Sequence, residues 1–283
     1  MVTTPPVRRR LVGAALRRYR ENLGYTLDDA ARTLECDRSK ISRIETGQRG
    51  IRGKELRELL AEYGIGDEQQ KILVALAARR DPSGWHHAYA DVLPGAWQDY
   101  LILEAFATKI VAYEPQRIPA LLQTPAYARE LAEADPALVG SDARDSAVAA
   151  TLARQKAILG ERKPDIQLII GEAALRQEVG GPDVMDGQLG LLAGISGDSG
   201  TVTVQVLPFS SGAHAAAGVG SLAMLQFDEV PGLGIVHLGG ASGGVCLESQ
   251  ADLAVHARVF EQLRAFALSP VQSALLLRGQ PDA

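Results

Sequence analysis

The N-terminal fold is decided by Gly24-Tyr25-Thr26-Leu27-Asp28-Asp29-Ala30-Ala31 and, six residues on, by Arg38-Ser39-Lys40-Ile41-Ser42-Arg43-Ile44-Glu45-Thr46-Gly47. Thr26 is a good N-cap for a short helix over Leu27–Leu34, and acidic residues in its first turn suit the helix dipole. Glu35-Cys36-Asp37 predicts a tight turn, and Asp37 is placed to cap a second helix over Arg38–Glu45. We therefore expect two short helices that pack across each other.

The helix predicted over Arg38–Glu45 has an apolar side and a polar side. Each residue turns a helix by about 100°, so Ile41 and Ile44 face the core together. The side chains on or beside the opposite face are all hydrogen-bond donors: Arg38, Ser39, Lys40, Ser42 and Arg43. An arginine can bond guanine O6 and N7 together, and a helix N-terminus favours phosphate. The pattern predicts a helix that enters the major groove of DNA.

Three further helices complete an all-α unit around this pair. Apolar residues recur at helical spacing over Arg8–Leu23, Lys54–Tyr63 and Asp67–Arg80. The turn-forming run Asp81-Pro82-Ser83-Gly84 then interrupts the pattern. We predict a five-helix DNA-binding domain over residues 1–80, a linker over 81–96, and a second domain over 97–283.

Charge is unevenly distributed between these two parts. The chain of 283 residues carries a net charge of −5, but residues 1–80 hold 17 Lys and Arg against 11 Asp and Glu, a net charge of +6, which leaves −11 for the remainder. A basic domain on an acidic one is expected when only the first faces phosphate. The sequence lacks a span of about 20 apolar residues and a signal peptide. Its two cysteines are far apart. We predict a cytoplasmic protein that needs no cofactor or metal.

The second domain mixes helical and strand patterns. The helices that we predict are Trp97–Tyr113, Pro125–Ala134, Asp142–Leu159, Ala251–Leu268 and Val271–Leu277. Strands are predicted where Val, Ile and Leu gather between turn-forming residues, over Ile166–Ile170, Thr201–Leu207, Leu222–Phe227 and Gly234–Leu238. The fold class expected is α+β, with a small, mainly antiparallel sheet.

The segment from about Val7 to Ile65 resembles the lambda-repressor-like (Xre-type) helix-turn-helix family. The string Ile41-Ser42-Arg43-Ile44-Glu45 is one of its more specific points of resemblance. The resemblance implies that Arg38, Ser39 and Arg43 read bases and that Lys40 lies near bases or phosphate. It also implies an interior ion pair between Arg20 and Glu45. Further candidates for base or phosphate contacts are Thr26, Ser42 and Arg49. Where the family often has a phosphate-clamping Gln, this chain has Leu27, so that contact is missing or is supplied by Thr26 or a backbone N–H.

The region from about Trp97 to Leu277 resembles a domain of unknown function that follows the helix-turn-helix in many regulators of filamentous, antibiotic-producing bacteria. The resemblance rests on several strings: Tyr113-Glu114-Pro115-Gln116-Arg117-Ile118-Pro119, Arg154-Gln155, Glu172-Ala173-Ala174-Leu175-Arg176 and Val206-Leu207-Pro208-Phe209. Some relatives are described as antitoxin-like, so the resemblance implies a small acidic partner protein. The stretch Val236–Gly244 departs from the family pattern, in which an acidic residue is usual.

Two functions fit these observations. The first is a sequence-specific transcription regulator, a homodimer on an inverted repeat of double-stranded DNA, controlled through its second domain by a ligand or a small protein. The second is an antitoxin-type protein that neutralises a small partner and binds DNA for autoregulation. Glu104, Arg154 and Glu172 could converge on a polar pocket, or form surface or interdomain ion pairs. The run around Ser242 matches a nucleophile elbow, but that chemistry needs a helix after the serine and a suitably placed histidine. We predict no enzyme.

Overall fold

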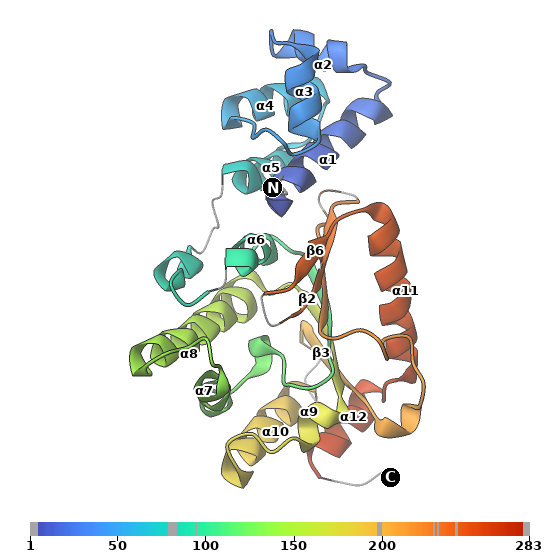
Figure 1. Cartoon of the computed structure of the whole chain (residues 1–283). Helices are drawn as coiled ribbons and strands as arrows, with labels where there is room; N and C mark the ends of the chain where they lie inside the picture. The colour runs from blue at the N-terminus through green and yellow to red at the C-terminus, as the bar shows by residue number, and fades with distance from the viewer. Residues whose placement is uncertain are drawn as a thin grey trace.

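The computed structural model of the chain describes residues 5–78, 84–93, 95–196, 200–228, 230, 232–240 and 243–279 (Figure 1). A helical N-terminal domain (α1 to α5) is followed by a C-terminal domain (α6 to α12) built on one sheet. Within these residues, no helix is long and apolar enough to cross a membrane. Asp81, Pro82 and Ser83 of the predicted linker lie outside the described residues, and so does Ser242.

The N-terminal domain has the five predicted helices, with small differences at their ends: α1 (Val7–Asn22), α2 (Leu27–Thr33), α3 (Arg38–Glu45), α4 (Gly53–Glu62) and α5 (Asp67–Ala78). Its core contains the apolar positions on which the helix prediction rested, and Leu16, Ile41 and Leu60 are almost fully buried. Thr26 forms a capping box with Asp29, which fixes where α2 begins. The caps and the helical spacing therefore agree with the observed elements.

Gly13 allows α1 to approach the end of α3 closely. A Cβ atom at Gly13 would lie 2.4 Å from the carbonyl oxygen of Ile44 and 2.6 Å from that of Glu45. Both neighbours are backbone atoms, which cannot move aside without shifting α3. The absent side chain at Gly13 thus sets the separation between α1 and the predicted DNA-reading helix.

The C-terminal domain is built on a six-stranded mixed sheet in the order β3-β2-β1-β4-β5-β6. Its strands are β1 (Lys109–Glu114), β2 (Asp165–Gly171), β3 (Val202–Leu207), β4 (Leu222–Gln226), β5 (Gly234–Leu238) and β6 (Val245–Leu247). The β1–β2 and β2–β3 pairings are parallel, and the other three are antiparallel. The α+β class is confirmed, but the sheet is larger than expected and mixed, with parallel pairings on one side of β1 and antiparallel pairings on the other.

The helix predicted over Trp97–Tyr113 is also wrong. Helix α6 (Gly95–Glu104) ends early, and Lys109–Glu114 forms β1 near the centre of the sheet. Ile110 and Val111 are buried on opposite faces of that sheet, so the strand is apolar on both sides. A short apolar run of this kind cannot be distinguished from buried helix by its periodicity. Pairing with β2 and β4 supplies the backbone hydrogen bonds that decide for the strand.

Helices cover both faces of the sheet (Figure 1). Helix α11 (Gln250–Phe266) packs on one face, where Phe260 and Leu263 join the side chains of β1 and β5. The helices of the other face and of the sheet's end are α7 (Pro125–Ala134), α8 (Ser141–Gln155), which continues as a π-helical turn over Lys156–Arg162, α9 (Glu172–Arg176), α10 (Pro182–Ser196) and α12 (Pro270–Leu277). The result is a layered domain with a core on each side of the sheet.

Ion pairs join the two domains through α1. The guanidinium of Arg8 lies 3.3 Å from the carboxylate of Asp99 on α6. Arg10 makes a two-pronged pair with Glu248, which directly follows β6, and its Nη2 donates to Oε2 at 2.7 Å. The hydrogen bond that Arg10 donates to Glu248 raises the pKa of Arg10, and burial opposes that rise. The first turn of α1 is therefore held against the C-terminal domain by two different elements.

Candidate nucleic-acid interface and a pocket in the C-terminal domain

The outer face of α3 carries exposed donors. Arg38, Ser39 and Arg43 are exposed, while Ile41 and Ile44 on the opposite side are buried. Figure 1 shows α2 and α3 on the side of the N-terminal domain that faces away from the C-terminal domain. A duplex could therefore approach α3 without meeting the sheet domain.

The two exposed arginines make only weak contacts within the chain. The Nε of Arg43 donates to the carbonyl oxygen of Ser39 at 3.2 Å, one turn earlier on α3. The guanidinium of Arg38 lies 4.0 Å from the carboxylate of Asp28, and both of these side chains are about two thirds exposed. Contacts of this kind between exposed groups are weak, so either guanidinium can turn to a base edge or a phosphate.

Other predicted DNA contacts are already engaged in the protein. The Nζ of Lys40 donates to Glu55 on α4 at 2.7 Å and is mostly buried, and that hydrogen bond lowers the pKa of Glu55. The hydroxyl of Thr26 accepts from the amide of Asp29 at 3.2 Å and donates to the Asp29 carboxylate. Ser42 is half-buried. Lys40 therefore joins α3 to α4 and Thr26 caps α2, while contacts of Thr26, Lys40 and Ser42 with DNA stay predictions.

Arg49 is exposed just beyond α3. Its backbone N–H donates to the carbonyl oxygen of Arg43 at 2.9 Å, which folds the segment after α3 back onto the helix. Gly47 adopts a left-handed backbone with φ of +73° in this turn, a conformation that glycine adopts without strain. The turn places a third exposed arginine close to the reading helix.

The structure brings Arg20 and Glu45 together inside the N-terminal domain. Arg20 Nε and Nη2 donate to the two oxygens of Glu45 at 2.7 and 2.9 Å, and both residues are buried. Arg20 Nη1 also donates to the carbonyl oxygen of Tyr25 at 2.8 Å. Burial, reinforced by the charge of Glu45, raises the pKa of Tyr63 to about 12. The ion pair ties α1 to Glu45, the last residue of α3.

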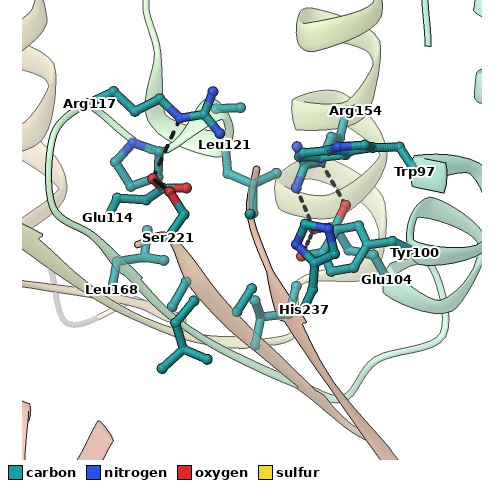
Figure 2. A pocket seen from close by; sticks show the side chains of 17 residues that line it. Trp97, Tyr100, Glu104, Glu114, Arg117, Leu121, Arg154, Leu168, Ser221 and His237 are labelled. Carbon is teal, nitrogen blue, oxygen red and sulfur yellow. Dashed lines mark hydrogen bonds and ion pairs between the residues drawn. The ribbon is translucent and has the colours of Figure 1, made fainter. Parts of the chain in front are cut away.

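The C-terminal domain contains a pocket between α6, α8 and the sheet (Figure 2). It is partly open to solvent, and its cavity volume is about 50 Å³. Its floor is apolar and comes from neighbouring strands, with Ala112 on β1, Leu168 on β2 and Ala223 on β4. Aromatic side chains of α6 form one wall. A small molecule would therefore meet a flat apolar surface bordered by polar groups.

One wall of the pocket is a buried ion pair, as Figure 2 shows. Arg154 of α8 donates from Nε and Nη2 to both oxygens of Glu104, each at 2.7 Å, and the hydroxyl of Tyr100 donates to the same carboxylate at 3.1 Å. The guanidinium also stacks over Trp97, 5.5 Å from the ring centre. Burial lowers the pKa of Arg154, but the charge and hydrogen bonds of Glu104 outweigh it and raise that pKa overall.

Glu114, Ser221 and Arg117 stand together at another side of the pocket (Figure 2). The hydroxyl of Ser221 donates to Glu114 Oε2 at 2.5 Å, and the Arg117 guanidinium lies 3.5 Å from the same oxygen. His237 of β5 packs 4.8 Å from the ring of Tyr100, and its Nε2 donates to the carbonyl oxygen of Gly243 at 2.8 Å. Burial lowers the pKa of His237.

The sequence-predicted trio of polar residues is only partly assembled. Glu104 and Arg154 meet in the pocket, but Glu172 lies elsewhere, where it pairs with Arg176 and accepts from the amide of Phe209 at 2.7 Å. Our sequence reasoning missed Glu114 and His237. Glu114 is the last residue of β1 and Arg117 follows three residues later, and the helix wrongly predicted up to Tyr113 hid that signal.

Comparison with known protein families gives two matches. A helix-turn-helix domain matches residues 11–71, which include α2 and α3. A domain of unknown function (DUF5753) matches residues 97–279, almost the whole of the described C-terminal domain. No curated protein and no solved structure matches the chain.

Proposed function

Because this chain belongs to the family of proteins with the DUF5753 domain, and carries a helix-turn-helix domain before it, we propose that it is a sequence-specific DNA-binding transcription regulator controlled through its C-terminal domain. The observation that carries the proposal is the outer face of α3, where Arg38, Ser39 and Arg43 are exposed around a buried Ile41–Ile44 side. Guanidinium groups in this position are suited to reading guanine in the major groove.

We further propose that the regulator acts as a homodimer on an inverted repeat. A single short helix reads few base pairs, and dimers of helix-turn-helix proteins gain specificity from two half-sites about 34–36 Å apart. Two-fold symmetry in the protein then requires the same symmetry in the DNA. The arrangement of two N-terminal domains would be set by the C-terminal domains that carry them.

Control can reach α3 through α1. The C-terminal domain holds Arg8 and Arg10 in the first turns of α1, and α1 touches α3 at Gly13 and through Arg20 and Glu45. A ligand or partner that favours one placement of α1 would change the affinity for DNA by its differential affinity for the two arrangements. The contacts that would transmit such a change are the ion pairs at both ends of α1 and the close approach at Gly13.

We propose that the C-terminal domain acts by binding and not by catalysis. The segment after Gly244 is strand β6, whereas the nucleophile-elbow chemistry considered for Ser242 needs a helix there. His256 Nδ1 lies 2.8 Å from the carbonyl oxygen of Asp252, within α11. Hydrolysis of an ester substrate that is lost on Ser242→Ala would contradict this part of the proposal.

The experiment for DNA binding is selection of bound duplexes from a random library by the full-length chain. We expect one enriched sequence with two inverted halves whose centres are about 34–36 Å apart, and a dimeric mass on that DNA. Recovery of random sequences, or of a single half-site by a monomer, would contradict the proposal.

A second experiment tests the control route. Glu248→Gln removes the charge that pairs with Arg10, and Glu261→Gln is a matched control because Glu261 pairs with the exposed Arg264 of its own helix, α11. We expect Glu248→Gln to alter affinity for the selected duplex and Glu261→Gln to leave it unchanged. Equal affinities for all three proteins would show that the contact between Arg10 and Glu248 does not reach the DNA-binding face.

An antitoxin-type role is the alternative, and one feature favours a protein partner. Phe209 and Val271 are large apolar residues that are 63% and 71% exposed. The helix that carries Val271, α12, lies at the end of the C-terminal domain away from α1 (Figure 1). A protein partner that binds at α12 would cover the exposed Val271 side chain. Growth arrest by a neighbouring small gene, relieved by this chain but not by its Val271→Asp variant, would support the alternative.

A further inference from the structure

We propose that the pocket between α6, α8 and the sheet is the regulatory binding site, and that it takes a small, net-neutral molecule with an apolar, flat body and a hydrogen-bonding group at each end. The regulatory role of this pocket rests on the function proposed above.

The floor calls for an apolar body. It is formed by small and aliphatic side chains of adjacent strands, including Ala112, Leu168 and Ala223. Trp97 stands at the wall, its ring stacked with the Arg154 guanidinium. A flat, apolar molecule would cover the alanines and contact this aromatic wall. The hydroxyl groups of a polar ligand would find no hydrogen-bond partners on that apolar floor.

The walls supply a donor and an acceptor. Arg154 uses Nε and Nη2 for Glu104, and no described residue accepts a hydrogen bond from its Nη1. The other end has the Glu114 carboxylate, in which Oε2 receives Ser221 while Oε1 has no hydrogen-bond donor among the residues that the structure describes. A ligand carbonyl would suit Arg154, and a ligand hydroxyl or amide N–H would suit Glu114.

Charge balance decides for a net-neutral ligand. The pocket's charged lining consists of two carboxylates and two guanidiniums, which already compensate one another as Glu104 with Arg154 and Glu114 with Arg117. Burial lowers the pKa of His237, so its ring stays neutral near physiological pH. A charged ligand would bring one uncompensated charge into this site, and an unpaired buried charge is costly.

The pocket adjoins the contacts that hold the N-terminal domain. Trp97 and Tyr100 line it from α6, and Asp99 of the same helix lies 3.3 Å from Arg8 of α1. His237, also in the lining, pairs in register with Cys246 of β6, and the strand is followed by Glu248, which holds Arg10. A ligand that shifts α6 would act on the pair of Arg8 with Asp99, and one that shifts His237 would reach the pair of Arg10 with Glu248 through β6.

The test uses three probes of the same shape in the absence of DNA: 4-hydroxybenzamide, which is neutral, 4-hydroxybenzoate, which is an anion, and 4-hydroxybenzylamine, which is a cation. The chain has two tryptophans, so Trp85→Phe leaves Trp97 as the only indole reporter. We expect 4-hydroxybenzamide to change Trp97 emission saturably, with a dissociation constant of about 1–10 mM for so small a molecule. The two charged probes should bind at least about tenfold more weakly.

Matched variants place the binding in the pocket. Ala223→Leu fills the floor, whereas Ala254→Leu adds the same atoms to an exposed position on α11, which covers the opposite face of the sheet. We expect the first to weaken 4-hydroxybenzamide at least about tenfold and the second to leave it unchanged. If Ala223→Leu does not fold, magnetisation transfer from bound 4-hydroxybenzamide to the Trp97 indole protons replaces it.

The outcomes separate this proposal from the function on which it rests. No saturable response to any probe, equal binding by the charged probes, or binding unchanged by Ala223→Leu with no transfer to Trp97 would overturn the ligand site or its class. Sequence-specific DNA binding would survive those results. Probe binding in a chain that selects no DNA sequence would instead keep the site and overturn the regulatory function.

Discussion

Glu45→Ala is the perturbation that most directly probes how α3 is held. Arg20 donates from two nitrogens to Glu45, and both residues are buried. The substitution leaves the Arg20 guanidinium in that site without its main partner. Removing one member of a buried pair typically costs about 3–5 kcal/mol. We expect about 3 kcal/mol here, because Arg20 Nη1 keeps the Tyr25 carbonyl and Nη2 lies 3.5 Å from Glu21.

Native-state hydrogen exchange on the full-length chain measures this cost without requiring the two domains to unfold separately. A loss of about 3 kcal/mol corresponds to roughly 150-fold faster exchange of the core amides of α1 and α3. Glu21→Ala is the matched control, since it removes the exposed carboxylate that contacts the same guanidinium. An exposed pair contributes less than about 1 kcal/mol. Exchange of the same core amides should therefore change little in Glu21→Ala.

A double variant tests the physical reason. Arg20→Leu together with Glu45→Leu removes both charges, so no unpaired charge stays buried, and we expect its stability loss to be smaller than that of Glu45→Ala. Unchanged exchange in Glu45→Ala, or an equal loss in the double variant, would refute the reasoning that the ion pair fixes α1 to α3.

Gly13→Ala should destabilise the N-terminal domain by about 1–3 kcal/mol in urea denaturation, because its Cβ would overlap backbone atoms of α3. The matched control is Gly190→Ala, at an exposed position of α10 where a Cβ meets open space, and it should stabilise the chain by about 0.5–1 kcal/mol. Burial lowers the pKa of His237 below its unfolded value, so the unfolded chain binds more protons and stability should fall as pH drops through about 6.5; a His237→Phe variant with the same pH slope would contradict this. Arg49→Ala should weaken specific and random duplexes equally if Arg49 contacts phosphate, and a selective loss on the specific duplex would make it a base contact.

The sequence was sufficient for the N-terminal domain because its signals are local. The cap at Thr26, the turn before Arg38 and the buried pair Ile41 and Ile44 each act within one or two helical turns. The sheet depends instead on pairing between distant segments. Lys109–Glu114 becomes a strand because β2 and β4 bond to it from both sides, and neither partner is near in sequence.

The candidate sites show the same limit. Arg43 could be placed on an outer face from helical spacing alone, and Arg20 and Glu45 through the family resemblance. The hydrogen bond from Lys40 to Glu55 could not be predicted, because Glu55 belongs to α4 and local sequence patterns do not give the angle at which α4 packs on α3. In the pocket, Glu104 of α6 pairs with Arg154 of α8, and Ser221, just before β4, donates to Glu114 at the end of β1. Both contacts join segments that are distant in sequence, so local patterns do not predict them.

The central claim is that α3 reads DNA sequence with Arg43. Its most direct test is the ratio of affinities for the selected duplex and a scrambled duplex, measured for the parent chain, for Arg43→Ala, and for Arg264→Ala, which removes an equal charge from exposed α11 of the other domain. Loss of a guanine contact worth about 1–3 kcal/mol should lower the ratio about 5- to 150-fold in Arg43→Ala and leave it unchanged in Arg264→Ala. An unchanged ratio in Arg43→Ala, with both affinities reduced equally, would contradict base reading by α3.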